Sequence, residues 1–240
     1  MNRMPLRDAL KETRDTLAGL GDEATREAQH LLTACLNIPL IAQHTEPERL
    51  INAQQIDKLR AWAARRASGE PLAYLTGRRE FWSLEFAVTP DVLVPRPDTE
   101  LLVERILCHG DELAKRLENG NSTSIRVADL GTGSGIIAIT VAHERPDWLC
   151  TAVDVSSKAL AIAAENAQNL VAGRVTLRHG SWFEPLADHH FDVIASNPPY
   201  VDSDDPVLKG DSLAFEPLLA LTAGPDALAA LNHLIEQAPR

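Results

Sequence analysis

Four consecutive residues, Asn197-Pro198-Pro199-Tyr200, could present two hydrogen-bond acceptors to a planar amino group. The asparagine side chain offers a carbonyl oxygen. Neither proline has an N–H, and Pro199 restrains Pro198 to an extended backbone, which leaves the Pro198 carbonyl oxygen free as a second acceptor. A planar –NH2 group carries two donors that match this pair. The quartet therefore suggests chemistry on an amide or an exocyclic amine, although Asn-Pro also opens many ordinary loops.

The elements around the quartet determine whether it can belong to a site. The apolar run 191–196 directly precedes it and is typical of a buried parallel strand. Ligands of open α/β sheets bind beyond the carboxyl ends of the strands, where this quartet would lie. The other strands and helices that the sequence predicts in the same alternation are 125–130, 136–142, 149–154, 156–170, 175–179 and 226–237.

A glycine-rich turn, Gly131-Thr132-Gly133-Ser134-Gly135, joins the first of these strands to its helix. Glycines let the backbone approach a ligand, and a helix N-terminus presents free N–H groups to an anion. Ile136 stands where the dinucleotide pattern G-x-G-x-x-G requires glycine, so a nucleoside that carries a carboxylate is the better ligand. Asp154 ends the next strand at a distance suited to accepting hydrogen bonds from ribose hydroxyls.

Trp182 and the pair His189-His190 follow the third predicted strand, 175–179, and could each contact a ligand. Trp182 follows the strand 175–179 and could pack on an adenine ring, or it could be an aromatic at the rim of the core. The pair His189-His190 resembles metal ligands, but no third ligand stands at a useful spacing. We therefore expect a solvated turn there and no metal.

The rest of the chain divides by pattern. Residues 1–72 repeat apolar side chains at helical spacing and predict a bundle of three or four helices, which could dock a substrate. Residues 73–97 predict a hairpin and a linker, with a turn at Pro90-Asp91. The third region, 98–240, carries the strands, the glycine turn and the quartet. The three cysteines, Cys35, Cys108 and Cys150, are odd in number and far apart in the sequence, so we expect them to be reduced, buried thiols.

Two further segments contain prolines next to charged residues. Prolines on both sides of Arg96 would hold its side chain in one direction, ahead of a helix that runs from Asp98 or Thr99 to about Leu117. A rigid linker is the alternative interpretation of this stretch. Phe215-Glu216-Pro217 could fold back toward the quartet.

Charge and hydropathy restrict the partners. The net charge of −11 over 240 residues argues against a protein that coats nucleic-acid phosphates. The N-terminus lacks the apolar segment of a signal peptide, and no apolar run could span a bilayer, so we expect a cytoplasmic protein without a membrane partner. Five arginines could steer an acidic partner, although a solvated helix face is the more ordinary explanation: Arg60, Arg65, Arg66, Arg78 and Arg79.

The glycine turn, Asp154 and the quartet together resemble class I S-adenosylmethionine-dependent methyltransferases that modify planar nitrogens. With the segments 70–77 and 94–100 and the helical N-terminus, the chain resembles the release-factor glutamine methyltransferase family, most closely from about Glu70 to Asp226. That resemblance implies an α/β, Rossmann-like doubly wound sheet after a small helical bundle. It also implies N5-methylation of the glutamine side-chain amide in the Gly-Gly-Gln motif of peptide-chain release factors, with S-adenosyl-L-methionine as methyl donor.

The resemblance further assigns roles to residues. The turn Gly131 to Gly135 would surround the methionine part of the cofactor, Asp154 would hold the ribose, and Trp182 would border the adenine. Asn197 would lie near both the cofactor and the substrate amide. The residues implied in catalysis and substrate binding are Asn197, Pro198, Pro199 and Tyr200, with the Pro198 carbonyl as second acceptor and Tyr200 beside the amide.

The family's sheet has seven strands, whereas the sequence predicts four in 98–240. We therefore expect this domain to lack its last strands. Two alternatives remain open: an adenine-N6 nucleic-acid methyltransferase, which shares the quartet, and a truncated non-catalytic module that binds the cofactor. The net negative charge of the chain favours a protein substrate, and we expect no direct binding of nucleic acid.

Overall fold

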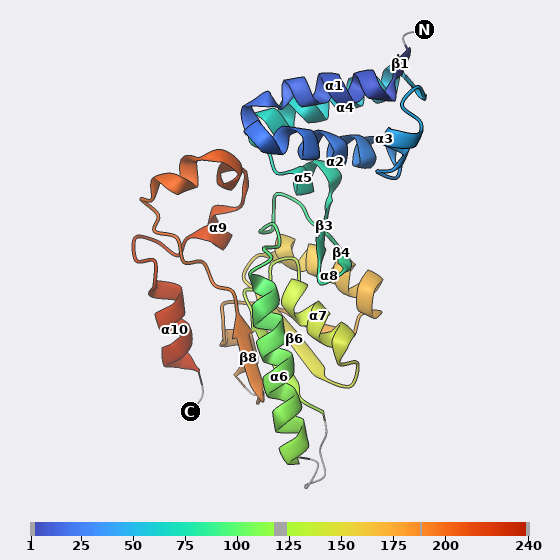
Figure 1. The fold of residues 1–240 in the computed structure, drawn as a ribbon. Helices are drawn as coiled ribbons and strands as arrows, with labels where there is room; N and C mark the ends of the chain where they lie inside the picture. Colours follow the sequence, from blue (N-terminus) through green and yellow to red (C-terminus); the bar gives the residue numbers. More distant parts are fainter. Residues whose placement is uncertain (1–2, 118–123, 188, 239–240) are drawn as a thin grey trace. The chain divides into compact units, whose positions relative to one another are not determined.

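The computed structural model describes residues 3–117, 124–187 and 189–238. The chain forms two compact units, Met1–Thr76 and Gly77–Arg240 (Figure 1). The division lies between residues 76 and 77, so the hairpin that the sequence groups with a linker over 73–97 is part of the second unit.

The first unit is a helical bundle with a two-stranded antiparallel sheet. Its elements are β1 (Arg3–Pro5), α1 (Leu6–Thr16), η1 (Ala18–Glu23), α2 (Ala24–Leu36), α3 (Ala42–Thr45), β2 (Leu50–Asn52), α4 (Ala53–Ala67) and α5 (Leu72–Thr76). Leu6, Leu17 and Leu31 are buried between the helices. They come from the helical apolar spacing that predicted the bundle. Asn52 and Gln55 form a capping box that starts α4.

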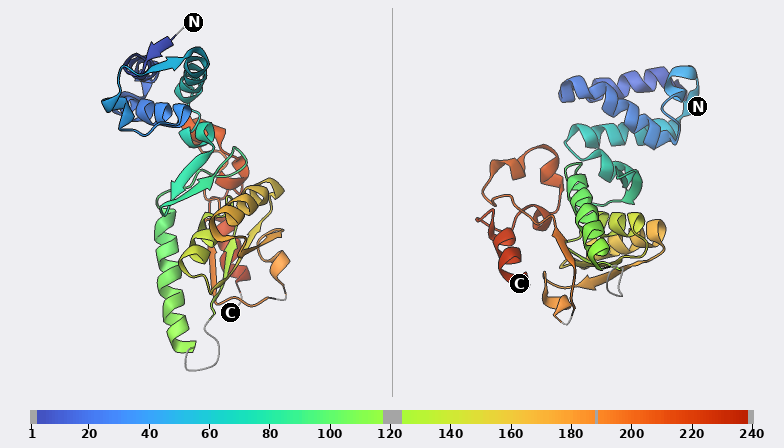
Figure 2. Two further views of the ribbon diagram at one scale, coloured as in Figure 1. Left: turned by 90° about the vertical axis from the view of Figure 1, so that its right-hand side faces the viewer. Right: turned by 60° about the horizontal axis from the view of Figure 1, so that its bottom comes forward.

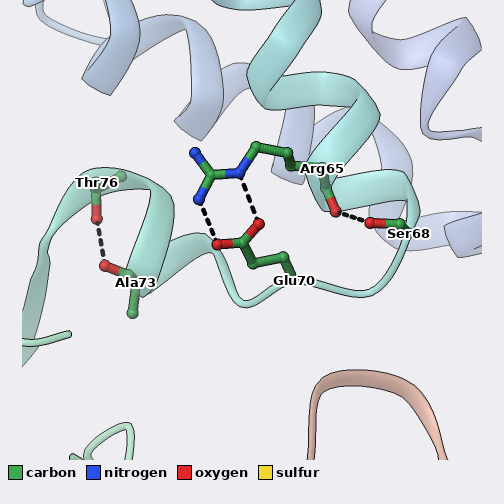
Figure 3. A network of polar contacts seen from close by, with 5 residues as sticks. All are labelled: Arg65, Ser68, Glu70, Ala73 and Thr76. Carbon is green, nitrogen blue, oxygen red and sulfur yellow. Dashed lines mark hydrogen bonds and ion pairs between the residues drawn. The ribbon is translucent and has the colours of Figure 1, made fainter. Parts of the chain in front are cut away.

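Four of the five arginines that could have steered an acidic partner form ion pairs within the chain. Figure 3 shows that Arg65 donates from Nε and Nη2 to the Glu70 carboxylate, at 2.7 and 2.5 Å. Two further hydrogen bonds stabilise the end of α4 and the helix α5. Ser68 Oγ donates to the Arg65 carbonyl, and Thr76 Oγ1 donates to the Ala73 carbonyl. The other pairs are Arg60 with Glu12, Arg66 with Glu27 and Arg78 with Glu85. Because acidic side chains of the chain already engage these four arginines, they are less suited to steering an external partner.

The second unit is built on a parallel sheet with the strand order β7-β6-β5-β8. Its elements are β3 (Arg78–Phe81), β4 (Leu84–Ala87), α6 (Thr99–Leu117), β5 (Arg126–Leu130), α7 (Ile136–Glu144), β6 (Leu149–Asp154), α8 (Ser157–Val171), β7 (Val175–His179), η2 (Glu184–Leu186), β8 (Val193–Ser196), η3 (Pro206–Lys209), η4 (Asp211–Phe215), α9 (Leu218–Leu221) and α10 (Ala229–Gln237). The described part of this sheet has four strands, the number that the sequence predicts.

Side chains of the sheet alternate between two cores. Val127 packs with residues of α6, α7 and α8 on one face, whereas Ala128 and Leu130 pack with Leu186 and Leu234 on the other. This period of two is what a strand buried on both faces requires. The result is a doubly wound arrangement, as the sequence predicts. Figure 2 shows the ribbon of this unit from two further sides.

The predicted hairpin is β3 and β4, which pair antiparallel. Its turn is Trp82-Ser83, where both residues have positive φ values of 55° and 59°, as in a type I′ turn. Pro90-Asp91, the turn that the sequence predicted, is a separate turn after β4, which the Val92 N–H closes onto the Thr89 carbonyl at 3.1 Å. The hairpin is fixed to α7 by Trp82, whose indole N–H donates to Glu144 at 2.9 Å.

Three boundary or burial predictions require correction. The last helix begins at Ala229 rather than at residue 226, because the Asp226 carboxylate accepts from the Leu228 N–H and makes a turn there. The strand before the quartet begins at Val193 rather than at residue 191. Cys108 is exposed on α6, whereas the other two cysteines are buried as predicted. Within the described ranges no helix is both long and apolar enough to cross a membrane.

Candidate active site

The register of the sheet brings the predicted site residues to one edge. Leu130 lies opposite Val153 of β6 and opposite Ser196 of β8. The residues that follow are the glycine turn, Asp154 and Asn197. Because the strands are parallel, all three segments leave the same edge of the sheet next to one another.

A cavity of about 370 Å³ lies at this edge, entirely within the second unit. This volume lies in the range of small-molecule sites. Its walls come from the carboxyl ends of the strands and from two segments outside the sheet. The segments that contribute lining residues are 91–99, 131–137, 154–159, 180–182, 197–199 and 217–223.

The glycine turn is held against β6 by its own backbone. Gly131 N–H and Thr132 N–H both donate to the Val153 carbonyl at 2.9 Å. Gly131, Gly133 and Gly135 have φ values of 74°, 58° and 87°, which side chains disfavour. A Cβ at Gly133 would meet nothing within 4 Å, so the turn leaves open space beside its backbone.

Asp154 fixes the glycine turn as well as lining the cavity. Its Oδ2 accepts from Gly133 N–H and its Oδ1 from Ser156 N–H, both at 2.8 Å. Ser156 Oγ caps α8 by accepting from Ala159 N–H at 3.2 Å, so Asp154 is not needed as the helix cap. Each carboxylate oxygen retains a further acceptor site for a ligand hydroxyl.

Asp129 is a site-supporting residue that the sequence analysis missed. It is fully buried on β5, and its Oδ2 accepts from the Thr132 hydroxyl at 2.6 Å and from Ala138 N–H at 3.3 Å. Its Oδ1 has no hydrogen-bond partner among the described residues. Burial raises the pKa of this carboxyl to about 6, against the lowering effect of the Thr132 hydrogen bond. The sequence did contain a signal for this role, because Asp129 is an acidic residue inside an otherwise apolar strand.

Asn197 carries the acceptor that the quartet was predicted to offer. Its Nδ2 donates to Thr99 Oγ1 at 3.4 Å, and Thr99 is itself buried. Its Oδ1 accepts no hydrogen bond from any described residue. The preceding Ser196 Oγ donates to the Leu130 carbonyl at 2.6 Å and fixes the end of β8 beside the glycine turn. The Asn197 oxygen is therefore available at the cavity.

The predicted residues differ in their place at the cavity. Pro199 lines it with Asn197, but Pro198 and Tyr200 do not, and the Tyr200 side chain is 64% exposed. Gly135 does not line it either, and a Cβ added there would lie 2.5 Å from Ile139 Cδ1 of α7. Whether Pro198 and Tyr200 contact a substrate stays a prediction.

The position of Trp182 is compatible with both interpretations of the sequence. It lines the cavity and approaches the glycine turn, where a Cβ on Gly131 would lie 3.5 Å from the indole ring. It also packs against the core cluster that contains Leu186 and Leu234. Nearby, His189 Nε2 lies 3.0 Å from an Arg178 Nη2 nitrogen, in keeping with a surface turn.

The segment 215–217 folds back at the cavity, as the sequence suggested. Glu216 accepts hydrogen bonds from Val94 N–H and from Arg96, and Pro217 lines the wall. Sequence reasoning missed the remainder of this wall, 219–223, and also missed Thr99. No local pattern identifies these residues, because their role depends on a contact between segments far apart in the chain.

This fold and cavity define a class I methyltransferase. Residues 110–209 match the family model described as "Methyltransferase small domain", and residues 8–77 match the "PrmC N-terminal domain". Among solved structures, the hMettl16 catalytic domain is similar with a TM-score of 0.49 and 15% identity, over 80% of this chain and 66% of that one. A similarity of this size supports no functional conclusion.

Curated relatives identify the family. The release factor glutamine methyltransferase of Salmonella typhimurium is 41% identical over 97% of this chain and 79% of its own length. That of Shewanella oneidensis is 39% identical, over 96% of this chain and 77% of its own length. The chain belongs to the release factor glutamine methyltransferase family.

Proposed function

We propose that this chain methylates the N5 side-chain amide nitrogen of the glutamine in the Gly-Gly-Gln motif of peptide-chain release factors. The methyl donor would be S-adenosyl-L-methionine. Family membership supports the substrate. The single structural observation that carries the proposal is Asn197: its Oδ1 accepts no hydrogen bond from a described residue, and the residue lines the same cavity as the glycine turn and Asp154.

The residues present fit the proposed cofactor. The open backbone at Gly133, with φ of 58°, leaves room for the methionine part beside the glycine turn. Asp154 keeps acceptor sites for ribose hydroxyls, and Trp182 offers an aromatic face for adenine. When bound, S-adenosylmethionine supplies an electrophilic methyl group on its sulfonium.

The role of the quartet follows from the poor reactivity of an amide nitrogen, whose lone pair is delocalised into the carbonyl. Asn197 Oδ1 and the Pro198 carbonyl would accept the two amide hydrogens and so fix the direction of the nitrogen. Orientation of this kind can contribute on the order of 7–11 kcal/mol to a reaction. The two acceptors would also stabilise the positive charge that develops on the nitrogen.

The direct test is mass spectrometry of a release factor after incubation with S-adenosylmethionine and this chain. We expect one added methyl group on the peptide with the Gly-Gly-Gln motif, and none when that glutamine is replaced by alanine. Methylation of an adenine-containing oligonucleotide in place of the release factor would contradict the proposal. It would instead support the adenine-N6 alternative.

We also propose that the unit Met1–Thr76 docks the protein substrate. In support, every cavity-lining residue belongs to the second unit, and the first unit matches a family model of its own. Ile41, which is 61% exposed, is a suitable probe on the first unit. Ile41→Ser should raise KM for the release factor but not for a short Gly-Gly-Gln peptide, whereas an equal rise for both would contradict docking there.

We place the reaction in the cytoplasm. All three cysteines are free thiols, as expected in a reducing compartment.

A further inference from the structure

We propose that Arg96 binds the carboxylate at the amino-acid end of the cofactor, and that Glu216 is the positioning residue that holds the Arg96 guanidinium at the cavity. This inference rests on the proposed use of S-adenosylmethionine. It concerns the recognition of the donor and not of the release factor.

The charges around the cavity leave one cationic group for a ligand carboxylate. Among the described residues that line it, the charged ones are Asp91, Arg96 and Asp154, so Arg96 is the one basic side chain. Asp91 is paired with Lys158 Nζ at 3.0 Å. A carboxylate that enters the cavity therefore finds a charge-assisted donor at Arg96 and is repelled by the two acidic groups.

Glu216 fixes the Arg96 guanidinium. The Glu216 side chain is 0% exposed, and its Oε1 accepts from Arg96 Nη2 at 2.5 Å. Its Oε2 accepts from Val94 N–H at 3.0 Å, so the carboxylate is also bound to the backbone of the segment that carries Arg96. A buried carboxylate is stable only when it is paired in this way. Pro95 and Pro97 further restrict the backbone on both sides of Arg96.

Arg96 keeps donors for a second partner. A guanidinium has five N–H donors, and the ion pair with Glu216 engages Nη2. The Arg96 side chain remains 36% exposed, in contrast to the fully buried Glu216. A planar guanidinium that is anchored on one side can bind a carboxylate on the other with two parallel hydrogen bonds.

The pair therefore predicts which part of a ligand Arg96 recognises. S-adenosylhomocysteine has both the ribose, for Asp154, and the carboxylate, for Arg96. 5′-Methylthioadenosine keeps the adenine, the ribose and the sulfur, but it lacks the amino-acid end. A change at Arg96 should weaken binding of the first ligand and leave that of the second unchanged.

The test is calorimetry of both ligands with the full chain. The main variant is the double substitution Arg96→Met with Glu216→Gln, because it leaves no buried unpaired charge. We expect it to lower the affinity for S-adenosylhomocysteine by about tenfold to a hundredfold, as for loss of a hydrogen bond to a charged group. The affinity for 5′-methylthioadenosine should not change. Arg145→Met removes an ion pair with Asp111 away from the cavity, and both affinities should survive it.

Arg96→Lys provides a second variant that keeps the charge facing Glu216. It should fold as the unaltered chain does, and it should lose affinity for S-adenosylhomocysteine alone, because an ammonium cannot form the planar paired hydrogen bonds. This measurement stays decisive if the double variant unfolds.

Three results would overturn the inference. Equal losses for the two ligands would mean that Arg96 only shapes the cavity. Unchanged binding of S-adenosylhomocysteine would remove the role altogether, and if KM for the release factor rose at the same time, Arg96 would belong to the protein substrate. An unaltered chain that binds S-adenosylhomocysteine but never methylates a release factor would refute the proposed substrate and leave the role of Arg96 standing. An unaltered chain without affinity for S-adenosylhomocysteine would overturn both.

Discussion

Replacing Asp129 by asparagine should change how the stability of the second unit depends on pH. The asparagine oxygen can still accept from the Thr132 hydroxyl, and its –NH2 group takes the place of the carboxylate oxygen that has no partner. Unpaired N–H groups cost about 1–3 kcal/mol at any pH. The variant also loses a buried group that titrates, and this second effect depends on pH.

The magnitude follows from the pKa of Asp129. Burial raises it to about 6 in the folded protein, from an ordinary value of 3.8. Well below pH 3.8 both folded and unfolded chains hold the proton. Between pH 4 and pH 6 the unfolded chain releases it first, so the free energy of unfolding falls as the pH rises. The whole loss is about 3 kcal/mol, at 1.36 kcal/mol for each pKa unit.

The assay is urea denaturation of both proteins at intervals from pH 4 to pH 7. Asp129→Asn should be the less stable protein at pH 4, and the difference should shift in its favour by about 2.4 kcal/mol by pH 7, because the unfolded carboxyl has already lost part of its proton at pH 4. Other titrating groups cancel in this difference. A difference that stays constant with pH would refute the assignment of a protonated, buried Asp129.

Asp111→Asn is a control, because the pKa of Asp111 is lowered in the folded protein whereas that of Asp129 is raised. The Arg145 guanidinium lowers the pKa of Asp111, so its carboxylate stabilises the fold above its unfolded pKa, and this stabilisation is lost as the pH falls through the folded pKa. The disadvantage of Asp111→Asn should therefore grow only as the pH rises toward about 4, and it should stay nearly constant from pH 4 to pH 7, where that of Asp129→Asn falls. Equal pH trends in the two variants would contradict both assignments.

Further predictions concern the site itself. Asn197→Ala should lower kcat by roughly 10²-fold or more in steady-state kinetics, and a normal kcat would remove its proposed role. Asp154→Ala should weaken binding of S-adenosylhomocysteine in calorimetry, and unchanged affinity would contradict ribose binding. Gly135→Ala places a Cβ 2.5 Å from Ile139 Cδ1 at a φ of 87°, so a urea melt should show a loss of about 1–3 kcal/mol, and an unchanged midpoint would exclude strain there. Iodoacetamide should modify Cys108 alone among the three cysteines, because the other two are buried with raised pKa values, and mass spectrometry showing rapid modification of a second thiol would contradict their burial.

The sequence predicted the parts of the site that depend on strand ends. The apolar runs ended at Leu130, Asp154 and Ser196, and the parallel register then placed the residues that follow at one edge. The residue types at these strand ends were enough to predict a ligand site, because a glycine turn, a carboxylate and an Asn-Pro pair can each contact a ligand there. Phe215 to Pro217 was also expected near the site, and Pro217 lines the cavity.

The remaining contacts could not be predicted because they join distant residues. The Arg96–Glu216 pair spans 120 positions, and the hydrogen bond between Asn197 and Thr99 spans 98. Neither partner shows its role in a local pattern. The exposure of Cys108 depended on which face of α6 meets the core, and a lone thiol gives no sign of that.

The most direct test of the central claim is a crystal structure of the chain with S-adenosylhomocysteine and a Gly-Gly-Gln peptide. Our account predicts that the glutamine –NH2 group donates to Asn197 Oδ1 and to the Pro198 carbonyl, with the nitrogen facing the sulfur across the cavity. A glutamine side chain bound elsewhere, or a ligand sulfur outside the cavity beside the glycine turn, would contradict it.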